Sequence, residues 1–268
     1  MKKILFCTDL SKSCNSLCKY IRDWVDQTDI VVDIIHSYDP DLVNIAAIDM
    51  PKLAAHQEKM KGEMIANMET FLTNLPENNR GKYHLVEDIN RALAIRQTAL
   101  IVKADLIVTG LRDRYTLLDK LIGSTAAKLV GDVNPPLMVI PYGRKFSPIK
   151  KVLFTTQESA KDQLSEREDN ALTWIYDNFN NDTIPDIHIL HVTNKRMSAS
   201  SEEHPLMPLK FTSTYSTDVV MGIIDHLESS SVDLLTVHHK EKNLWERIHK
   251  SSVAKNLLYK ANMPILFL

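Results

Sequence analysis

The chain has 268 residues, of which 32 are basic and 34 acidic, so its formal net charge at pH 7 is -2. This balance argues against nucleic-acid or membrane-surface partners that bind through charge. No apolar run approaches the roughly 20 residues that a membrane helix needs, and too few apolar residues follow the opening MKK for a signal peptide. The length predicts two domains of about 100–150 residues each.

The three cysteines, Cys7, Cys14 and Cys18, all lie in the first predicted strand and helix. An odd number without a repeated framework indicates reduced thiols, so we expect a cytoplasmic protein. Cys14 and Cys18 are four residues apart and share a helix face, where they could bind a metal or form a redox pair. No His or Asp stands at a zinc-like spacing from them, which favours a packing role and no metal site.

In the first half of the chain, short aliphatic and β-branched runs alternate with amphipathic stretches. The runs are continuously apolar, which is typical of parallel strands covered on both faces. The stretches between them show helical spacing, as at Leu17, Ile21 and Trp24. Strands alternating with helices predict an open parallel sheet with helices on both faces. The predicted strands are 4–8, 31–37, 106–110 and 137–141.

The second half repeats the first. KKILFCTDLS at 2–11 matches KKVLFTTQES at 150–159, and ADLIVTG at 104–110 matches VDLLTVH at 232–238. The closing segment of the first half, ending in NPPLMVI, matches the last residues of the chain in the same register, which pairs Asp105 with Asp233. Repetition of this kind indicates a tandem duplication. We therefore expect two domains, at 1–145 and 148–268, joined by a short linker.

The two copies differ in the middle. Residues 46–75 form a long helical stretch with Met60, Met64 and Met68 on one face, for which core packing is a better explanation than a promiscuous binding surface. The second copy has instead a polar, Ser-rich stretch at 194–214. Its composition predicts an irregular surface loop or a short mobile segment.

The chain resembles the universal stress protein (UspA) family, as a tandem two-domain member. The resemblance is carried by ILFCTDLS with Asp9, by the second-strand His36, by the ADLIVTG-to-GST segment and by NPPLMVIP. It implies two tandem Rossmann-like (adenine nucleotide alpha hydrolase-like) α/β domains, each with a five-stranded parallel sheet of order 3-2-1-4-5. It also implies that the domains pair through their last strands, at 136–141 and 264–268. Association of two chains into a homodimer stays open.

Nucleotide-binding members of this family carry G-x2-G-x9-G-(S/T). In that register this chain has Gly110, then Asp113 in place of the second glycine, then Gly123 and Ser124. Glycines let backbone N–H groups approach phosphates closely, and a helix that begins near Gly123 would offer unpaired N–H groups. The resemblance thus implies a site for ATP or another adenine nucleotide, with Mg²⁺, formed by Asp9, Ile35, His36, Gly110, Arg112, Gly123, Ser124 and Thr125.

A structural explanation of the same motif stays open. Ser124 would serve as a helix N-cap and Gly110 would end a strand in a protein without any ligand, and the charge of Asp113 repels phosphate. The second copy has lost more of the motif, because Gln157 replaces Asp9 and His238 replaces Gly110. We therefore expect the second domain to be structural or regulatory.

Two functions remain at this stage. The first is a cytoplasmic stress-response sensor or regulator that binds an adenine nucleotide in its first domain, with at most weak ATP hydrolysis. The alternative is a nucleotide-free interaction module that acts through its paired domain surfaces and the 194–214 segment. No catalytic residue is assigned, because no general base or metal-binding pair is evident beside the glycine motif; a hydrolase that uses Asp9 or Asp113 with Mg²⁺ has the least support.

Overall fold

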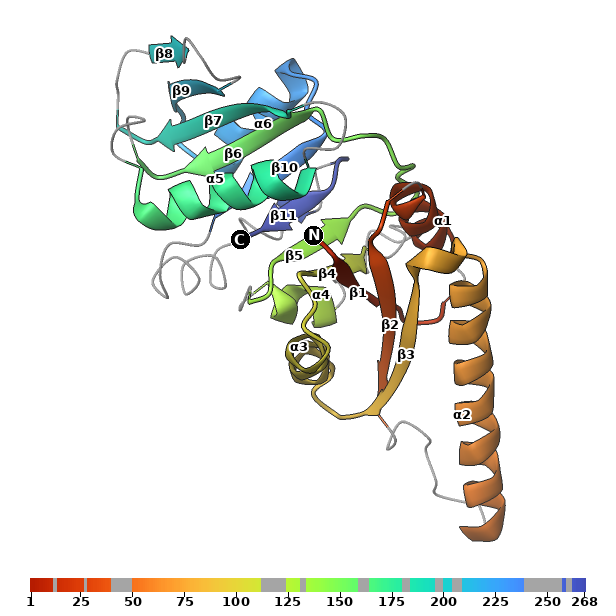
Figure 1. Ribbon diagram of the computed structural model, residues 1–268. Helices are drawn as coiled ribbons and strands as arrows, with labels where there is room; N and C mark the ends of the chain where they lie inside the picture. Colours follow the sequence, from red (N-terminus) through yellow and green to blue (C-terminus); the bar gives the residue numbers. More distant parts are fainter. Residues whose placement is uncertain are drawn as a thin grey trace.

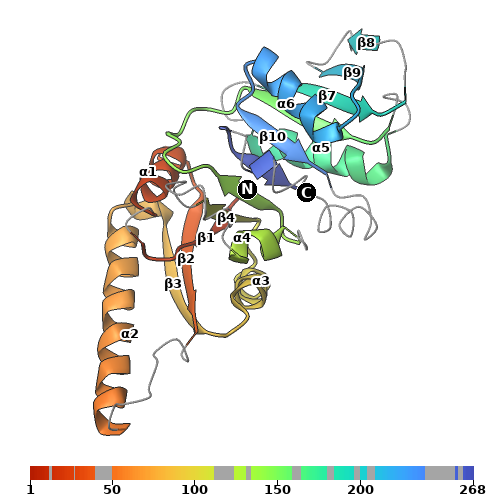
Figure 2. The ribbon, with the colours of Figure 1, turned by 180° about the vertical axis from the view of Figure 1, so that it is seen from behind.

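The computed structural model describes most of the chain, and it shows two α/β domains that share one sheet (Figures 1 and 2). Eleven strands follow in the order β3-β2-β1-β4-β5-β11-β10-β6-β7-β9-β8. The α/β class with a mostly parallel sheet is confirmed. The described residues are 1–11, 14–26, 28–39, 50–111, 124–130, 134–158, 164–179, 184–195, 200–203, 209–238, 257–258 and 262–268.

The first domain contributes five parallel strands to this sheet. Successive residues along each strand point to opposite faces of the sheet. One set packs under α1 and α2, and the other set packs under α3 and α4. Both faces are therefore buried, which explains why the strands are continuously apolar in sequence. The elements are β1 (Lys3–Cys7), α1 (Cys14–Val25), β2 (Val31–Tyr38), α2 (Met50–Thr73), β3 (Arg80–Glu87), α3 (Arg91–Ile101), β4 (Leu106–Gly110), α4 (Ser124–Leu129) and β5 (Leu137–Ile140), with a 3-10 turn at Glu77–Asn79.

The predicted helix at 46–75 corresponds to α2. Met68 is fully buried in the core, whereas Met60 and Met64 are half-buried. In both views α2 extends beyond the edge of the sheet, and Lys61 ties it to β3 through an ion pair of 3.3 Å with Glu87 (Figures 1 and 2). The methionine face therefore packs on the core only near the C-terminal end of the helix.

The second domain repeats this arrangement and adds a strand. Its parallel strands follow the order β9-β7-β6-β10-β11, and β8 pairs antiparallel with β9 at the outer edge. Helix α5 packs on the same apolar layer as α1, and α6 on the same layer as α3. The elements are β6 (Lys151–Thr156), α5 (Glu166–Phe179), β7 (Asp186–Thr193), β8 (Ser200–Glu203), β9 (Leu209–Tyr215), α6 (Val219–Ser229), β10 (Leu234–Val237) and β11 (Ile265–Phe267).

The prediction of an irregular loop at 194–214 was wrong for the strand-forming parts of that segment. Strand β8 and most of β9 lie within it, and β9 pairs in parallel with β7 along its whole length. Leu209, Phe211 and Ser213 are buried, while the residues that alternate with them, Lys210, Thr212 and Thr214, are only partly so. This alternation is the pattern of a half-buried strand, and the Ser and Thr content of the segment concealed it.

Strands β5 and β11 join the two domains. They pair antiparallel, with Leu137 opposite Phe267 and Met138 opposite Leu266. All four side chains are buried. The last strand of each domain would otherwise be an exposed apolar edge, so the pairing removes the edge from both domains at once.

In each domain an aspartate holds the start of the first strand; Asp105 directly precedes β4, and Asp233 directly precedes β10. One carboxylate oxygen of Asp105 accepts the backbone N–H groups of Lys2 and Lys3, at 2.7 and 2.9 Å. Asp233 does the same for Lys150 and Lys151, at 3.0 and 2.9 Å. The match between Asp105 and Asp233 in the sequence therefore has a physical cause, because each carboxylate satisfies two backbone donors.

Replacing Asp233 by Ala should lower the free energy of unfolding by about 0.5–1.5 kcal/mol, because two backbone N–H groups lose their protein acceptor. Asp233→Asn keeps one acceptor oxygen of similar geometry and should lose less. Urea unfolding of the two variants and the native protein measures the difference. Equal losses in the two variants would contradict this role of the acceptor.

Two histidines form a contact between β7 and α6. Nε2 of His226 lies 3.1 Å from Nδ1 of His188, whose Nε2 lies 2.8 Å from the Thr212 hydroxyl. Burial, followed by the charges of His226 and Lys210, lowers the pKa of His188 to about 4. Burial and Lys210 also lower the pKa of His226. Both rings are therefore neutral near pH 7, and one donates an N–H to the other.

We expect the protein to lose stability as the pH falls from about 6.5 towards about 4, because the folded-state pKa of His188 lies below its ordinary value. Between these pH values the unfolded chain binds a proton at His188 and the folded chain does not. The stabilisation that comes from the neutral His188 is therefore complete only above about pH 6.5. His188→Gln should flatten this part of the pH dependence, measured by urea unfolding across the window. His56→Gln, an exposed position on α2, is the control; an unchanged slope in His188→Gln would refute the prediction.

Candidate functional site

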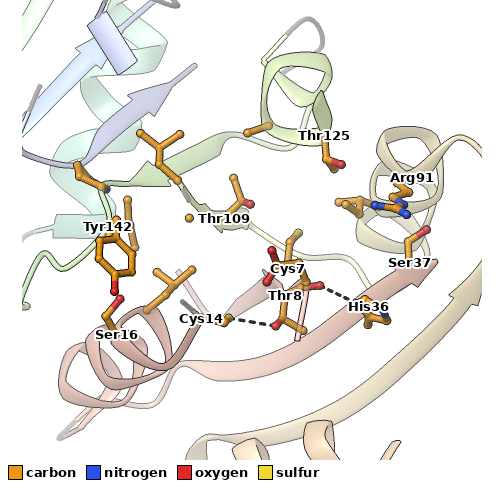
Figure 3. A pocket seen from close by; sticks show the side chains of 18 of the residues that line it. Cys7, Thr8, Cys14, Ser16, His36, Ser37, Arg91, Thr109, Thr125 and Tyr142 are labelled. Carbon is orange, nitrogen blue, oxygen red and sulfur yellow. Dashed lines mark hydrogen bonds between the residues drawn. The ribbon is translucent and has the colours of Figure 1, made fainter. Parts of the chain in front are cut away.

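A cavity of about 410 Å³ opens at the carboxyl ends of β1, β2 and β4 (Figure 3). This is where an open parallel α/β sheet places its ligand crevice. Its floor is apolar, with Cys7, Leu17 and Ile140 among the residues that form it. The polar side chains in its wall are Thr8, Asp9, Ser16, His36, Ser37, Tyr38, Arg91, Thr109, Thr125 and Tyr142.

Thr8 organises the loop that leaves β1. Its backbone N–H donates to the carbonyl of Ile35 at 3.0 Å, and its own carbonyl accepts from Nδ1 of His36 at 2.9 Å. Its hydroxyl accepts the N–H of Leu10 at 3.0 Å and contacts the sulfur of Cys14, also at 3.0 Å. Leu10 has a φ of 56°, in the left-handed region that bulky residues rarely occupy. The hydrogen bonds of Thr8 hold this strained turn in place.

Asp9 lies at the mouth of the cavity and is exposed. One of its carboxylate oxygens accepts the N–H of Ser11 at 3.0 Å, which closes an Asx turn. The residue predicted from the sequence thus lines the cavity and also shapes the loop between β1 and α1.

His36 forms the part of the wall contributed by β2. Its Nδ1–H donates to the carbonyl of Thr8, so Nε2 is left as an acceptor. Burial lowers the pKa of His36, although the Thr8 hydrogen bond opposes that shift. The ring is parallel to that of Tyr38, with 3° between the planes and 6.3 Å between the centroids. The site therefore presents a neutral imidazole beside an aromatic ring.

Ser37 and Arg91 form a polar corner of the cavity. The Ser37 side chain is 7% exposed, and its hydroxyl has no hydrogen-bond partner among the described residues. Arg91 is the first residue of α3, directly after the N-cap Asn90, and its guanidinium is the only cationic side chain among the described lining residues. Figure 3 shows both side chains on the same side of the cavity. A buried hydroxyl without a partner indicates a place for a ligand atom or a water.

The structure brings together four of the predicted site residues. Asp9, His36, Gly110 and Thr125 all line the cavity, from the loop after β1 and from β2, β4 and α4. Ile35 does not, because its side chain is 1% exposed and packs in the apolar layer. Helix α4 begins at Ser124. Arg112, Asp113 and Gly123 lie outside the described residues.

Gly110 has a packing role that is independent of any ligand. A Cβ atom at this position would lie 2.6 Å from Cδ2 of Leu17, on α1. A larger residue would therefore force the end of the Leu17 side chain to move. The contact with Leu17 supports a structural role for Gly110, and this role is compatible with a place in a phosphate-binding motif.

Sequence analysis missed several lining residues, chiefly Thr8, Ser37, Arg91 and Thr109. Each lies at the carboxyl end of a strand or at the start of the helix that follows β3. The order of the strands alone predicts that such positions meet at one edge of the sheet. The positions of these residues at the ends of strands could be read from the sequence. Those positions do not show which of the side chains face the cavity.

The second domain places a carboxylate where the first has a thiol. The hydroxyl of Thr156, the counterpart of Thr8, donates to Glu168, which also accepts from the N–H and hydroxyl of Ser165. Burial works to raise the pKa of Glu168, but these hydrogen bonds hold it below its ordinary value. The side chain is 1% exposed. A buried negative charge at this position disfavours a phosphate ligand.

Within the described ranges, no three His, Cys, Asp or Glu side chains are grouped so that they could hold a metal ion. None of the helices in the described part of the chain is long and apolar enough to cross a membrane.

We predict that His36 is the Nδ1–H tautomer at neutral pH, because Nδ1 can reach the Thr8 carbonyl only as a donor. Nitrogen-15 NMR of the imidazole ring reports the tautomer directly, and the ring should stay neutral to lower pH than an exposed histidine does. An Nε2–H tautomer would show that this hydrogen bond is absent in solution.

Comparison with known proteins agrees with this architecture. The model of the universal stress protein family matches residues 1–141. A universal stress protein from Archaeoglobus fulgidus DSM 4304 aligns over 99% of this chain and 95% of its own, with 12% identity and a TM-score of 0.63. A functionally unknown protein from Pseudomonas aeruginosa PAO1 aligns over 100% and 92%, with 9% identity and a TM-score of 0.62. Identities this low show a shared fold.

No curated protein gives a significant match to the sequence. The family model spans more than half of the 268 residues and includes every residue of the cavity wall except Tyr142. The resemblance predicted from ILFCTDLS and the GST segment is therefore confirmed, and the chain belongs to the universal stress protein family.

Proposed function

We propose that the first domain binds an adenine nucleotide in the cavity at the carboxyl ends of β1, β2 and β4, and that the protein acts as a stress-response sensor or regulator. The observation that carries the proposal is the buried Ser37 hydroxyl, which has no partner among the described residues and lies in the cavity wall. Burial of an unpaired hydroxyl costs about 1–3 kcal/mol, which a ligand acceptor or donor would recover.

The dimensions and chemistry of the cavity suit a nucleotide. Its volume of about 410 Å³ falls within the range of about 300–1,000 Å³ that is usual for small-molecule sites. Arg91 supplies a charge for phosphate oxygens, and the hydroxyls of Thr109 and Thr125 supply donors. The carboxylate of Asp9 is suited to the ribose hydroxyls or the exocyclic amine of adenine.

The same lining gives little support for turnover. Asp9 is the only carboxylate among the described lining residues, so Mg²⁺ would be held chiefly by the phosphates of the nucleotide that brings it. We therefore propose a binding role with at most weak ATP hydrolysis. ATP is one candidate; ADP and AMP fit the same chemistry.

The Ser37→Ala variant gives the sharpest test. Removal of the hydroxyl should weaken nucleotide binding about three- to tenfold, because a hydrogen bond to the ligand is lost. It should leave the ligand-free protein at least as stable as before, because no described partner is lost. Isothermal titration with ATP, ADP and AMP measures the affinity, and urea unfolding measures the stability.

Arg91→Ala should weaken binding more, by about tenfold or greater, because a charge-assisted hydrogen bond is lost. Arg167→Ala, an exposed arginine on α5 of the second domain, is the matched control and should bind as the native protein does. If the native protein binds none of the three nucleotides, the proposal fails. The nucleotide-free interaction module then becomes the better explanation.

A further inference from the structure

The wall of the cavity contains a pair of thiols. Cys14, the first residue of α1, is 9% exposed and lines the cavity. Figure 3 shows its side chain turned towards Thr8. Cys18 lies one turn further along α1, with its sulfur 3.9 Å from that of Cys14. A small reagent that enters the cavity therefore meets Cys14, with a second thiol directly behind it.

Two side chains lie within hydrogen-bonding distance of the Cys14 sulfur. The Thr8 hydroxyl oxygen accepts the N–H of Leu10, so its proton is available to the Cys14 sulfur at 3.0 Å. The thiol of Cys18 donates to the same sulfur. Two donors aimed at one sulfur stabilise its thiolate over its thiol. The left-handed backbone of Leu10, with a φ of 56°, keeps the Thr8 hydroxyl in this arrangement.

The same contacts separate the two thiols in acidity. The hydrogen bond from Cys18 lowers the pKa of Cys14 most, burial opposes it, and the hydrogen bond from Thr8 adds to it. The charge of Asp9 works against ionisation, whereas its backbone favours it. The pKa of Cys18 is raised, first by its bond to Cys14 and then by burial. Cys14 is therefore the nucleophile of the pair, and Cys18 keeps its proton.

Cys7 provides a contrast within the same cavity. It is buried in the apolar layer under α3, and burial raises its pKa well above the ordinary value. Its sulfur lies 4.0 Å from the carbonyl of Leu5, a contact that does not stabilise a thiolate. Only one of the three cysteines thus has the environment of a reactive thiol.

We infer that Cys14 is a peroxide-reactive thiol and that Cys18 is the thiol that resolves it, which gives the first domain a redox-modification site in the wall of its cavity. In the first step the Cys14 thiolate attacks one oxygen of a hydroperoxide. The S–O bond forms, the O–O bond breaks, and the leaving oxygen takes a proton and departs as water or an alcohol. Cys14 loses two electrons to the peroxide and becomes a sulfenic acid.

In the second step Cys18 gives up its proton and its sulfur attacks that of Cys14. The S–S bond forms, the S–O bond breaks, and the departing hydroxide takes the proton and leaves as water. The sum is two thiols and one hydroperoxide converted to one disulfide, one alcohol or water, and one further water.

The disulfide requires a local movement. The two sulfurs must approach from 3.9 Å to about 2.05 Å. Cys14 stands in the first turn of α1, and its N–H donates to the carbonyl of Ser11, outside the helix, at 2.9 Å. Only this turn has to shift for the sulfurs to meet, because its N–H groups are not part of the hydrogen bonding within the helix. The shift would withdraw the Cys14 sulfur from Thr8 and change the cavity wall. An effect on nucleotide binding would rest on the proposed function, but the modification itself does not.

The test treats the full-length native protein with hydrogen peroxide in the absence of nucleotide, blocks free thiols after denaturation, and analyses tryptic peptides by mass spectrometry. Trypsin places Cys14 and Cys18 in peptide 13–19 and Cys7 in peptide 4–12. Peptide 13–19 should lose two hydrogens as an internal disulfide, at least about tenfold faster than peptide 4–12 is oxidised. Oxidation of both peptides at one rate, or no oxidation of peptide 13–19, would overturn the inference.

Two variants assign the roles. Cys18→Ser should stop at the sulfenic acid on Cys14, which dimedone traps; a failure to trap it there would count against Cys14 as the attacking thiol. Thr8→Val removes the hydroxyl and keeps the backbone carbonyl that holds His36, so it should slow the oxidation of Cys14 about three- to tenfold. An unchanged rate in this variant, with its circular dichroism unchanged, would remove Thr8 as the positioning residue. Because no nucleotide is present, these results are independent of nucleotide binding.

Discussion

The antiparallel pairing of β5 with β11 is the constraint on which the rest of the structure depends. Each strand is the last of its domain and is buried on both faces, so neither could stand as a solvent-exposed edge. Met138 and Leu266 belong to the apolar layer under α1 and α5, whereas Leu137 and Phe267 belong to the layer under α3 and α6. Both layers therefore run through the junction, and the two domains behave as parts of one sheet.

The direction of this pairing also separates the carboxyl ends of the two sets of strands. Apart from β8, the strands within each domain run parallel, but the two sets run in opposite directions across the junction. Their carboxyl ends therefore lie at opposite ends of the strands in the shared sheet. Every residue that lines the cavity accordingly belongs to the first domain. The second domain could lose its own glycine motif, and place Glu168 beside Thr156, without disturbing the first. The first domain thus has an open cavity, and the second has a buried carboxylate at the matching position.

One residue connects the chemistry of the remaining cavity. Thr8 holds His36 through its backbone and Cys14 through its hydroxyl, while Leu10 closes the strained turn beside it. A ligand in the cavity and the oxidation state of Cys14 would therefore act on the same few atoms. This is a physical route by which a protein of this family could respond to two different chemical signals with one site.

Local patterns of the sequence predicted much of the architecture. Continuous apolar runs predicted the buried strands, and the repeated segments predicted the duplication. The ILFCTDLS and GST motifs predicted the family, and three residues that the sequence singled out, Asp9, His36 and Gly110, line the cavity. The fold class and the family were predictable because each depends on residues close together in the chain.

Contacts between distant segments were decided only by the tertiary structure. The composition of the polar 209–215 segment indicated a loop. It forms β9 because it pairs with β7 and because Phe211 is buried in the core. Arg91, and the donors that converge on Cys14, acquire their roles from neighbours that come from other strands or from the turn held by Thr8. A side chain's partners depend on which strands lie beside it. The sequence determined that buried strands would form, whereas hydrogen bonding between strands far apart in the chain determined which residues would meet.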